Sequence, residues 1–283
     1  MYLNNSKIKD IVLEALREDK ASFDITTKAL IGRKRKANAQ IIAREDCILS
    51  GLAVAKAVFK AIHPHLKFVS RFKDGAAIGK GSIVAKISGN ARAILSGERV
   101  ALNFLSHMSG IATLTAKFLN KVRGTKVKIM DTRKTIPLMR QLEKYAFSCG
   151  GGIKNRMSLA DSVIIKDNHK KILRGHNLKD IIKKAKLKTS SNTKIEIEIE
   201  NIKEFSQIIH FAPDIIMLDN MSLAQLKTCL ILKRRFSPKT KLEASGGVSL
   251  QNVHAIAKTG VDFISVGCLT HSPKAIDFSL DIA

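Results

Sequence analysis

The amino-acid sequence predicts an α/β protein in which a β/α barrel follows a smaller N-terminal domain. Six short apolar segments between residues 126 and 271 each end in charged, hydroxyl-bearing or glycine residues. They recur about every 20 to 35 residues, which is the spacing of a β/α barrel. The 283 residues, 45% of them hydrophobic, are enough to fill two cores. Because the carboxyl ends of barrel strands point to one mouth, we expect the segment ends to surround a single cavity, as in an enzyme.

The residues before the barrel show helical and strand patterns in turn. Apolar residues at helical spacing predict an amphipathic helix over 6–17, and strand-like runs follow at 38–45 and from 47. Four glycines within 72–89 mark tight turns in a small β-rich module. Two successive helices are predicted over 93–108 and 109–122, the second with Ser109 as its N-cap. The segment after 271 is too short for a domain and must pack on one already formed.

Composition narrows the class of protein. The four cysteines and eight histidines are dispersed, so neither a disulfide framework nor a zinc site is indicated. The start of the chain has no signal-peptide pattern, and no apolar run is long enough for a membrane span, so we expect a soluble cytoplasmic protein. The net charge of +25 fits either a nucleic-acid surface or a Lys-rich protein with an anion site. With 5% aromatic residues and no Trp, the second interpretation is favoured, and a non-catalytic nucleic-acid-binding protein stays as an alternative.

The segment KIEIEIE at 194–200 places acidic side chains on one face of a strand. Its alternation puts Glu196, Glu198 and Glu200 on the face opposite the isoleucines, and helices outside a barrel would make the glutamate face the inner one. Two like charges ~4 Å apart repel by about 4 kcal/mol at an effective dielectric of 20, so cations must lie nearby. The candidates are Lys134, Arg156, Lys166 and a divalent metal. The alternative is an exposed edge strand with a solvated glutamate face.

Basic and glycine-rich segments follow several of the other strands. Arg133 and Lys134 lie near the end of KVKIMDTRKT at 126–135. A helix that begins near Pro137 would carry Arg140 and Lys144, and Arg156 comes shortly after a triple glycine. Such cations suit carboxylates and phosphates, with charge-assisted hydrogen bonds worth about 1.5–3 kcal/mol each.

Two glycine turns predict a phosphate site. Gly246 and Gly247 lie between a strand and an expected helix N-terminus, and SVGCLTH at 265–271 adds a turn at Gly267 one strand later. Each turn alone is ordinary, whereas the two together favour phosphate. No nucleophile pair of the Ser–His or Cys–His kind is evident, so the expected chemistry is charge stabilisation of anionic substrates.

The motifs GERVALNFLSHMSGIAT, DTRKT, LEKYA, IKDNH, EIEIEN, MLDN, ASGG and GVDFISVGCLTHS resemble those of the quinolinate phosphoribosyltransferase family, also called nicotinate-nucleotide pyrophosphorylase. The resemblance runs from EALREDKASFDITT to the last residues. It implies an N-terminal α/β sandwich over 1–109, with 270–283 packing back on it. It also implies an incomplete, seven-stranded β/α barrel of the type II phosphoribosyltransferase kind over 110–269.

The resemblance further implies an activity in NAD biosynthesis. The family transfers a phosphoribosyl group from phosphoribosyl pyrophosphate to quinolinate, with Mg²⁺, giving nicotinate mononucleotide, carbon dioxide and pyrophosphate. A ModD-like paralogue that acts on another anionic acceptor is the alternative within the fold. Family members form homodimers in which an arginine of one subunit completes the neighbour's site, and Arg99 holds that position here.

The resemblance assigns roles to residues of this chain by motif. Lys134, Lys166, Glu198 and Asp219 would be catalytic, and Glu198 and Asp219 would contact the metal together with pyrophosphate. The full substrate-binding set comprises Arg99, Thr132, Arg133, Lys134, Asn155, Arg156, Lys166, Glu198, Asp219, Ser245, Gly246, Gly247, Gly267, Cys268 and Leu269.

The chain departs from the family pattern at three positions. Phe23 takes the place of a glycine before Asp24, Leu138 takes the place of another glycine, and Asn155 replaces a histidine. In the family that histidine helps to bind the pyridine dicarboxylate. Asn155 therefore bears directly on which acid the protein accepts.

Overall fold

The computed structural model describes residues 5–173, 175 and 177–283, and the chain divides into two compact units. Unit 1 comprises Met1–Ala116, Thr135–Gly151 and Leu269–Ala283, and unit 2 comprises Lys117–Lys134 and Gly152–Cys268. The chain therefore passes between the units four times. This division differs from the expected boundary after residue 109, because 135–151 groups with unit 1. The extent of the independently folding domains stays a prediction.

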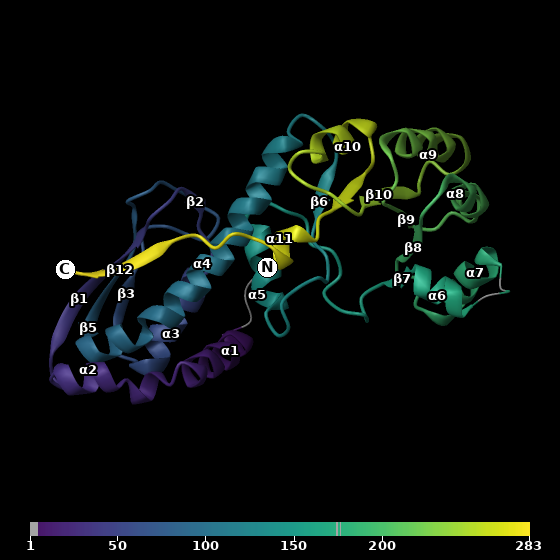
Figure 1. Cartoon of the computed structure of the whole chain (residues 1–283). Coiled ribbons are helices and arrows are strands. Elements are labelled where there is room, and N and C mark those ends of the chain that lie inside the picture. The colour runs from purple at the N-terminus through teal and green to yellow at the C-terminus, as the bar shows by residue number, and fades with distance from the viewer. Residues whose placement is uncertain (1–4, 174, 176) are drawn as a thin grey trace. The chain divides into compact units, whose positions relative to one another are not determined.

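An antiparallel sheet is the centre of unit 1. Its four strands lie in the order β12-β1-β5-β3, and they are Phe278–Ile282, Lys36–Ala43, Ile83–Asn90 and Lys67–Val69 (Figure 1). In β1 the alternate residues Ala39, Ile41 and Ala43 are buried, as the period of two for a half-buried strand requires. A smaller antiparallel pair joins β2 (Cys47–Ile48) to β4 (Ala77–Ile78). The last strand of the chain thus completes the sheet that the first strand begins.

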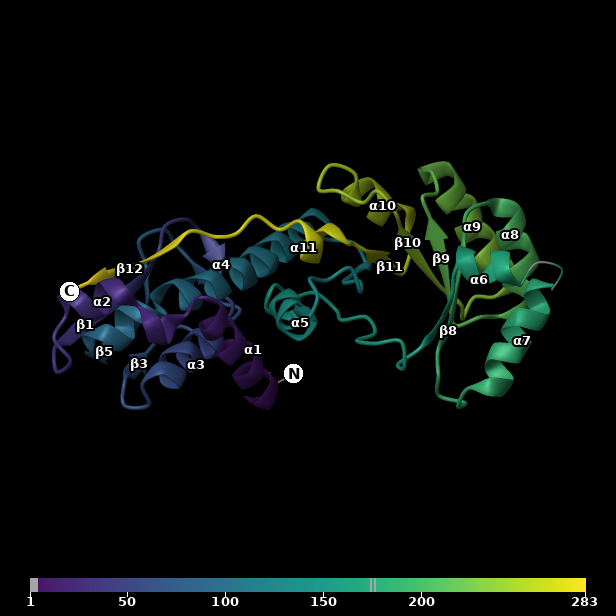
Figure 2. The ribbon, with the colours of Figure 1, turned by 60° about the horizontal axis from the view of Figure 1, so that its bottom comes forward.

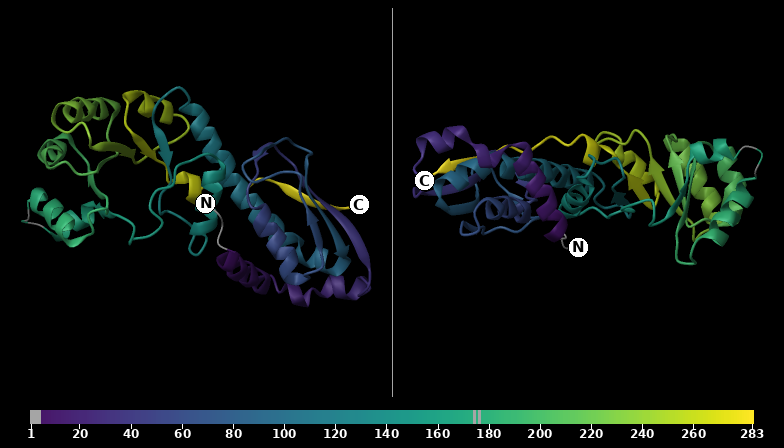
Figure 3. Two further views of the ribbon diagram at one scale, coloured as in Figure 1. Left: turned by 180° about the vertical axis from the view of Figure 1, so that it is seen from behind. Right: turned by 90° about the horizontal axis from the view of Figure 1, so that it is seen from below.

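Helices cover one face of this sheet (Figures 1 and 3). Helix α1 (Asn5–Glu18) packs against α3 (Leu52–Ile62), and the fully buried Val58 and Phe59 anchor α3 in the core. The other helical elements of unit 1 are η1 (Ala21–Phe23), α2 (Ile25–Leu30), α5 (Arg140–Cys149) and α11 (Cys268–His271, with Cys268 in unit 2), together with most of α4 (Ala91–Lys121).

Helix α4 is continuous over 31 residues, so the two helices expected over 93–122 are one, and the N-cap assigned to Ser109 is wrong. Ser109 is fully buried, and its Oγ accepts a hydrogen bond from Ser50 N (3.0 Å) and donates to Ser50 O (3.1 Å). At the next residue, a Cβ on Gly110 would lie 2.3 Å from Lys274 O. The serine and glycine that resemble a helix break therefore serve close packing instead.

Unit 2 contains six parallel strands with helices between them. The strands are β6 (Lys128–Met130), β7 (Val163–Ile165), β8 (Ile195–Ile199), β9 (Ile215–Asp219), β10 (Lys241–Ser245) and β11 (Phe263–Ser265), in the order β6-β11-β10-β9-β8-β7. The helical elements are α6 (Asp167–Ile172), α7 (Leu178–Lys188), α8 (Ile202–Ile208), η2 (Ile209–Phe211), α9 (Leu223–Phe236) and α10 (Val253–Thr259). Figure 2 shows α7, α8 and α9 along one side of this sheet.

The α/β class and the combination of an antiparallel-sheet domain with a parallel β/α domain are confirmed. The parallel sheet has six strands in the described part of the chain, whereas the family resemblance implied seven. Among the described residues, no helix combines the length and the apolar character needed to cross a bilayer. The four cysteines are free, in agreement with the expected lack of a disulfide framework.

Candidate active site

The ends of the parallel strands bring most of the expected site residues to one edge of unit 2. Asp131 to Lys134 follow β6, Lys166 follows β7, Glu198 lies near the end of β8, and Asp219 ends β9. Ser245 ends β10 in register with Asp219, and Gly267 and Cys268 come shortly after β11. Because all six strands are parallel, these positions share the carboxyl edge of the sheet, where α/β proteins bind ligands.

Two of the expected residues belong to unit 1. Arg99 lies on α4 with 66% of its side chain exposed, and its nearest carboxylate is that of Glu98 at 4.0 Å. Leu269 is fully buried in unit 1, so its side chain contributes to a core. Lys144, expected on the same helix as Arg140, is also in unit 1, and it is buried at 1% exposure.

An ion pair between neighbouring strands lies at the centre of the strand-end group. Lys166 Nζ donates to Glu198 Oε2 at 2.8 Å, and the side chains are 48% and 11% exposed. A nearly buried carboxylate requires such a partner, since an unpaired charge there costs several kcal/mol. The half-exposed ammonium keeps a free side for an anionic ligand. This pair joins two residues that the sequence assigned separately to the site.

The inward glutamates expected from KIEIEIE are present at two of the three positions. Glu196 and Glu198 are 2% and 8% exposed, which excludes the alternative of a solvated edge strand. Glu200 is exposed and lies beyond the end of β8, so its expected inward position is wrong. The strand is two residues shorter than the acidic repeat, and the repeat continues into a turn.

A third buried glutamate, Glu243 on β10, escaped the sequence-based prediction. It is fully buried, Ser265 Oγ donates to its Oε1, and it is aligned with the same β9 residue, Met217, as Glu198. Burial and then the charge of Glu243 raise the pKa of Glu196, and burial raises the pKa of Glu243. These two carboxyls therefore hold protons at higher pH than ordinary glutamates. The alternation of side chains along the strand KLEAS could have identified Glu243, because alternation points its side chain to the same face of the sheet as Glu198.

The loop after β6 is tied to the loop that carries Arg156. Asn155 N donates to the fully buried Asp131 Oδ1 at 2.8 Å, and Asn155 Oδ1 accepts from Arg156 N at 2.7 Å. Arg156 also donates from a terminal guanidinium nitrogen to Ser162 O at 3.0 Å. Burial, and then repulsion from Arg133, lower the pKa of Arg156, while Glu196 opposes this shift. Arg133 and Arg156 thus both place positive charge at this edge of the sheet.

The glycine turn after β10 has a geometry that only glycine allows. Gly246 has φ +89°, and a Cβ there would lie 2.2 Å from Asn220 Oδ1. Two hydrogen bonds fix the position of Asn220: its N donates to Ser245 O at 2.9 Å, and its Nδ2 donates to Asp219 Oδ2 at 3.0 Å. The turn therefore links the carboxyl end of β10 to Asp219 on β9.

The helix expected immediately after this turn begins later. Helix α10 starts at Val253, six residues beyond Gly247, and has only seven residues. A tight loop in which Asn252 Nδ2 donates to Gly247 O at 2.9 Å fills the interval. Loop residues, rather than a helix N-terminus, therefore follow Gly246 and Gly247. After β11, in contrast, α11 begins directly at Cys268, whose pKa is raised by burial.

The carboxylates at this edge are compatible with a metal that is held partly by substrate. Within the described residues, no group of three or more Asp, Glu, His or Cys side chains is arranged to hold a metal ion. Glu198 and Asp219 supply two carboxylates on adjacent strands. Mg²⁺ is commonly bound by one or two carboxylates together with substrate phosphates, so the donor set fits such a shared site.

The fold and this edge define a class of protein. A parallel β/α unit with cations at its strand ends, buried carboxylates beside them and a glycine turn is typical of an enzyme that acts on anionic substrates. Family models give the particular family. The model described as quinolinate phosphoribosyl transferase, N-terminal domain, matches residues 24–109, and the corresponding C-terminal domain matches 111–281. The chain belongs to the quinolinate phosphoribosyltransferase family.

Individual relatives agree over nearly the whole chain. A probable nicotinate-nucleotide pyrophosphorylase [carboxylating] from Methanocaldococcus jannaschii is 40% identical over 285 residues, which cover 97% of this chain and 98% of the relative. One from Bacillus subtilis is 36% identical over 284 residues, covering 99% and 95%. The solved nicotinate-nucleotide pyrophosphorylase from Francisella tularensis has a TM-score of 0.93 at 38% identity, covering 100% and 98%. These matches make the chain similar to phosphoribosyltransferases in both of its parts.

Proposed function

We propose that this protein transfers the phosphoribosyl group of phosphoribosyl pyrophosphate to quinolinate, with loss of carbon dioxide, in NAD biosynthesis. The products would be nicotinate mononucleotide, carbon dioxide and pyrophosphate. The observation that carries the proposal is the Lys166–Glu198 pair at the strand ends, among further cations and a glycine turn, in a chain of this family. Both substrates are strongly anionic, as such an edge requires.

The cations would bind and orient the two substrates. Arg133, Lys134, Arg156 and Lys166 would hold the quinolinate carboxylates and nearby phosphates, while Ser245, Gly246, Gly247 and Gly267 would hold the 5′-phosphate. Thr132 accepts a hydrogen bond at Oγ1 from Lys134 N (3.1 Å), which fixes the turn that presents Lys134. Fixed donors of this kind need little reorganisation when charge develops in the reaction.

The carboxylates would act on the ribose. Glu198 and Asp219 would contact the ribose hydroxyls and stabilise positive charge that builds on the ring as pyrophosphate departs. Mg²⁺, held by these carboxylates and by the pyrophosphate, would supply charge neutralisation for the leaving group. Once the ring nitrogen of quinolinate is bonded to ribose it is cationic, and it can accept the electrons released when carbon dioxide is lost. No protein nucleophile is needed.

A direct assay tests the proposal. Purified protein with Mg²⁺, phosphoribosyl pyrophosphate and quinolinate should form nicotinate mononucleotide, carbon dioxide and pyrophosphate in equal amounts, and no product should appear without phosphoribosyl pyrophosphate. Nicotinate offered in place of quinolinate is the control for the acceptor. Absence of quinolinate turnover in folded protein would contradict the proposal.

A second candidate is an enzyme of the same reaction type with another anionic acceptor, as in the ModD-like alternative. It is favoured by one observation: Asn155 replaces the family histidine, and its side chain caps the backbone of Arg156. If quinolinate remains the acceptor, Asn155→His should lower the KM for quinolinate and leave the KM for phosphoribosyl pyrophosphate unchanged. A panel of pyridine and other aromatic carboxylates, assayed by pyrophosphate release, separates the two candidates.

We also propose that the active form is a homodimer, or a higher assembly, in which Arg99 is donated to the neighbouring site. The exposed Arg99 side chain supports this proposal. Arg99→Ala and Arg133→Ala should each be inactive, whereas refolding an equal mixture should restore roughly a quarter of wild-type activity, because half of the sites in mixed dimers are intact. Full activity in Arg99→Ala would contradict the shared site. The cytoplasmic location stays a prediction.

A further inference from the structure

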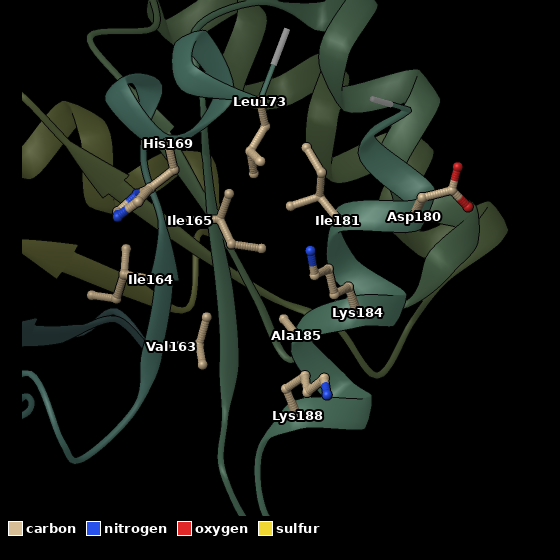
Figure 4. A pocket seen from close by; sticks show the side chains of 10 residues that line it. All are labelled: Val163, Ile164, Ile165, His169, Leu173, Asp180, Ile181, Lys184, Ala185 and Lys188. Carbon is tan, nitrogen blue, oxygen red and sulfur yellow. The ribbon is translucent and has the colours of Figure 1, made fainter. Parts of the chain in front are cut away.

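A cavity of about 340 Å³ lies in unit 2 between the edge strand β7 and helix α7 (Figure 4). Its walls are mostly hydrocarbon, supplied by Val163 and Ile165 of β7, by Leu173, and by Ile181 and Ala185 of α7. None of the residues assigned to the candidate active site lines it. The volume falls at the lower end of the range of about 300–1,000 Å³ that small-molecule sites occupy.

The cavity arises from the choice of side chains on the inner face of α7. Ile181 and Ala185 are one helical turn apart and face β7, where Val163 and Ile165 point toward them (Figure 4). Ile181 packs tightly, at 9% exposure, whereas Ala185 has no side chain beyond Cβ to fill the next turn. The unfilled space is therefore located beside Ala185, where an apolar group from outside would replace the missing packing.

Two lysines give this apolar cavity a positive rim. Lys184 and Lys188 line it from successive turns of α7, and Lys184 reaches toward β7, while the Asp180 carboxylate points away (Figure 4). Within the described residues neither lysine has an ion-pair partner, in contrast to Lys170 nearby, which pairs with Glu204 at 2.9 Å. The helix as a whole carries five lysines and one aspartate. An anionic group at the rim would thus meet two uncompensated ammonium groups.

We propose that this cavity is a second ligand site, which binds a small amphipathic carboxylate with its hydrocarbon part against Val163, Ile165 and Ala185 and its carboxylate at Lys184 and Lys188. The volume is too small for a helix or strand of a protein partner, which excludes a docking groove. The apolar walls favour hydrocarbon over a phosphorylated sugar. None of the residues proposed to be catalytic lines the cavity, so ligand binding here can be tested separately from the proposed reaction.

The site lies close to Lys166 along the chain. His169 also lines the cavity, and its Nδ1 accepts a hydrogen bond from Lys166 N at 2.9 Å. Lys166 is the residue at which β7 ends and α6 begins. One side chain thus connects the cavity wall to the backbone that carries the Lys166–Glu198 pair.

Octanoate is a suitable probe, with 1-octanol as the uncharged molecule of equal chain length. Isothermal titration of the full chain should show saturable binding of one octanoate. Lys184→Gln/Lys188→Gln should weaken octanoate binding roughly tenfold and leave octanol binding unchanged. The matched control is Lys183→Gln/Lys186→Gln, which removes the same charge from the same helix at residues that do not line the cavity, and it should change octanoate affinity less than about twofold.

Ala185→Phe fills the cavity and should abolish binding of both probes at an unchanged melting temperature. The proposal is overturned if octanoate shows no saturable binding up to about 10 mM, if the control pair weakens it as much as Lys184→Gln/Lys188→Gln, or if folded Ala185→Phe binds like wild type. Should Ala185→Phe fail to fold, the comparison of the two lysine pairs decides. None of these measurements requires enzymatic activity, so their outcome is separate from that of the quinolinate assay.

Discussion

The two sheets of this molecule bury different chemistry. In unit 1, the buried positions of β1 and β5 hold only apolar side chains, among them Ile41, Val84 and Ile87. In unit 2, β8 and β10 bury Glu196, Glu198 and Glu243 among their isoleucines and leucines. Burying carboxylates costs stability unless each one is paired or protonated. The parallel sheet therefore depends on the ion pair of Glu198 and on the raised pKa values of Glu196 and Glu243, and such groups are typical of a functional site.

The largest expected effect comes from removing the cation of the Lys166–Glu198 pair, which tests whether the buried charge of the parallel sheet is functional. Lys166→Met should lower kcat/KM for the proposed reaction by about 10³-fold or more, because it takes a fixed positive charge from the substrates and leaves Glu198 unpaired. Lys170→Met is the matched control, since it breaks a Lys–Glu pair of similar length, 2.9 Å, away from the strand ends. Its kcat/KM should stay within about threefold of wild type. Similar losses in both variants would refute the special role of Lys166.

The glycine turn provides the next test. Gly246→Ala should destabilise the protein by about 2 kcal/mol and raise the KM for phosphoribosyl pyrophosphate, because the new Cβ would displace Asn220 and the turn around it. Gly124→Ala has nearly the same φ, +84°, with nothing within 4 Å of a Cβ, so it measures the backbone cost alone. Chemical denaturation and initial rates compare the two. If Gly246→Ala costs no more than Gly124→Ala, the close approach to Asn220 is unimportant.

The buried carboxyl pair predicts a dependence of stability on pH. Because the folded-state pKa of Glu243 is raised above the ordinary value of 4.5, its contribution is fully present below pH 4.5 and is lost as the pH rises through the higher folded value. The free energy of unfolding should thus fall by about 1–2 kcal/mol between pH 5 and pH 8.

Glu243→Gln should flatten this decline, because the amide still accepts the hydrogen bond from Ser265 and carries no charge. Glu200→Gln changes an exposed carboxyl of the same acidic repeat and should leave the slope as it is. Thermal unfolding at several pH values distinguishes the three proteins. A slope unchanged in Glu243→Gln would assign the pH dependence to other groups.

The smallest expected effect is in unit 1, where Leu138 has a left-handed backbone conformation that glycine would adopt at lower cost. Leu138 has φ +67° and is 90% exposed, so it incurs the left-handed backbone cost without burying its side chain. Leu138→Gly should raise the free energy of unfolding by about 0.5–1 kcal/mol. Leu159→Gly, at an exposed leucine with negative φ, should instead be neutral or destabilising. Destabilisation by Leu138→Gly would show that its side chain has a contact worth more than the strain.

The strand-end residues were predictable because their signal is local. A parallel strand carries its polar residue at its carboxyl end, so the positions of Lys166, Glu198, Asp219 and Ser245 follow from where each apolar segment stops. The sequence also predicts the inward facing of Glu196 and Glu198 from alternation alone. Glu243 follows the same rule, but a single glutamate in a five-residue strand is a weak pattern beside a threefold repeat.

The features that were missed depend on distant parts of the chain. Ser109 resembles a helix cap until the contact with Ser50 is known, and Gly110 resembles a break until Lys274 is seen against it. The late start of α10 is the exception, because its cause is local: Asn252 closes the loop onto Gly247, five residues before it. Local sequence patterns contain no information about a contact with a residue more than a hundred positions away, such as the contact of Gly110 with Lys274.

The pairing of β12 with β1 has a consequence for how the chain is made. From Ala39↔Ile282 to Ala43↔Phe278, the bonding partners of β1 on one side are synthesised only after all of unit 2. All of unit 2 is synthesised between the two strands, so topologically it is an insertion within one sheet. Until β12 has been made, β1 presents an open edge to any other extended chain. During synthesis the sheet of unit 1 is therefore the one more open to pairing with other chains, although the buried side chains of β1 and β5 are all apolar.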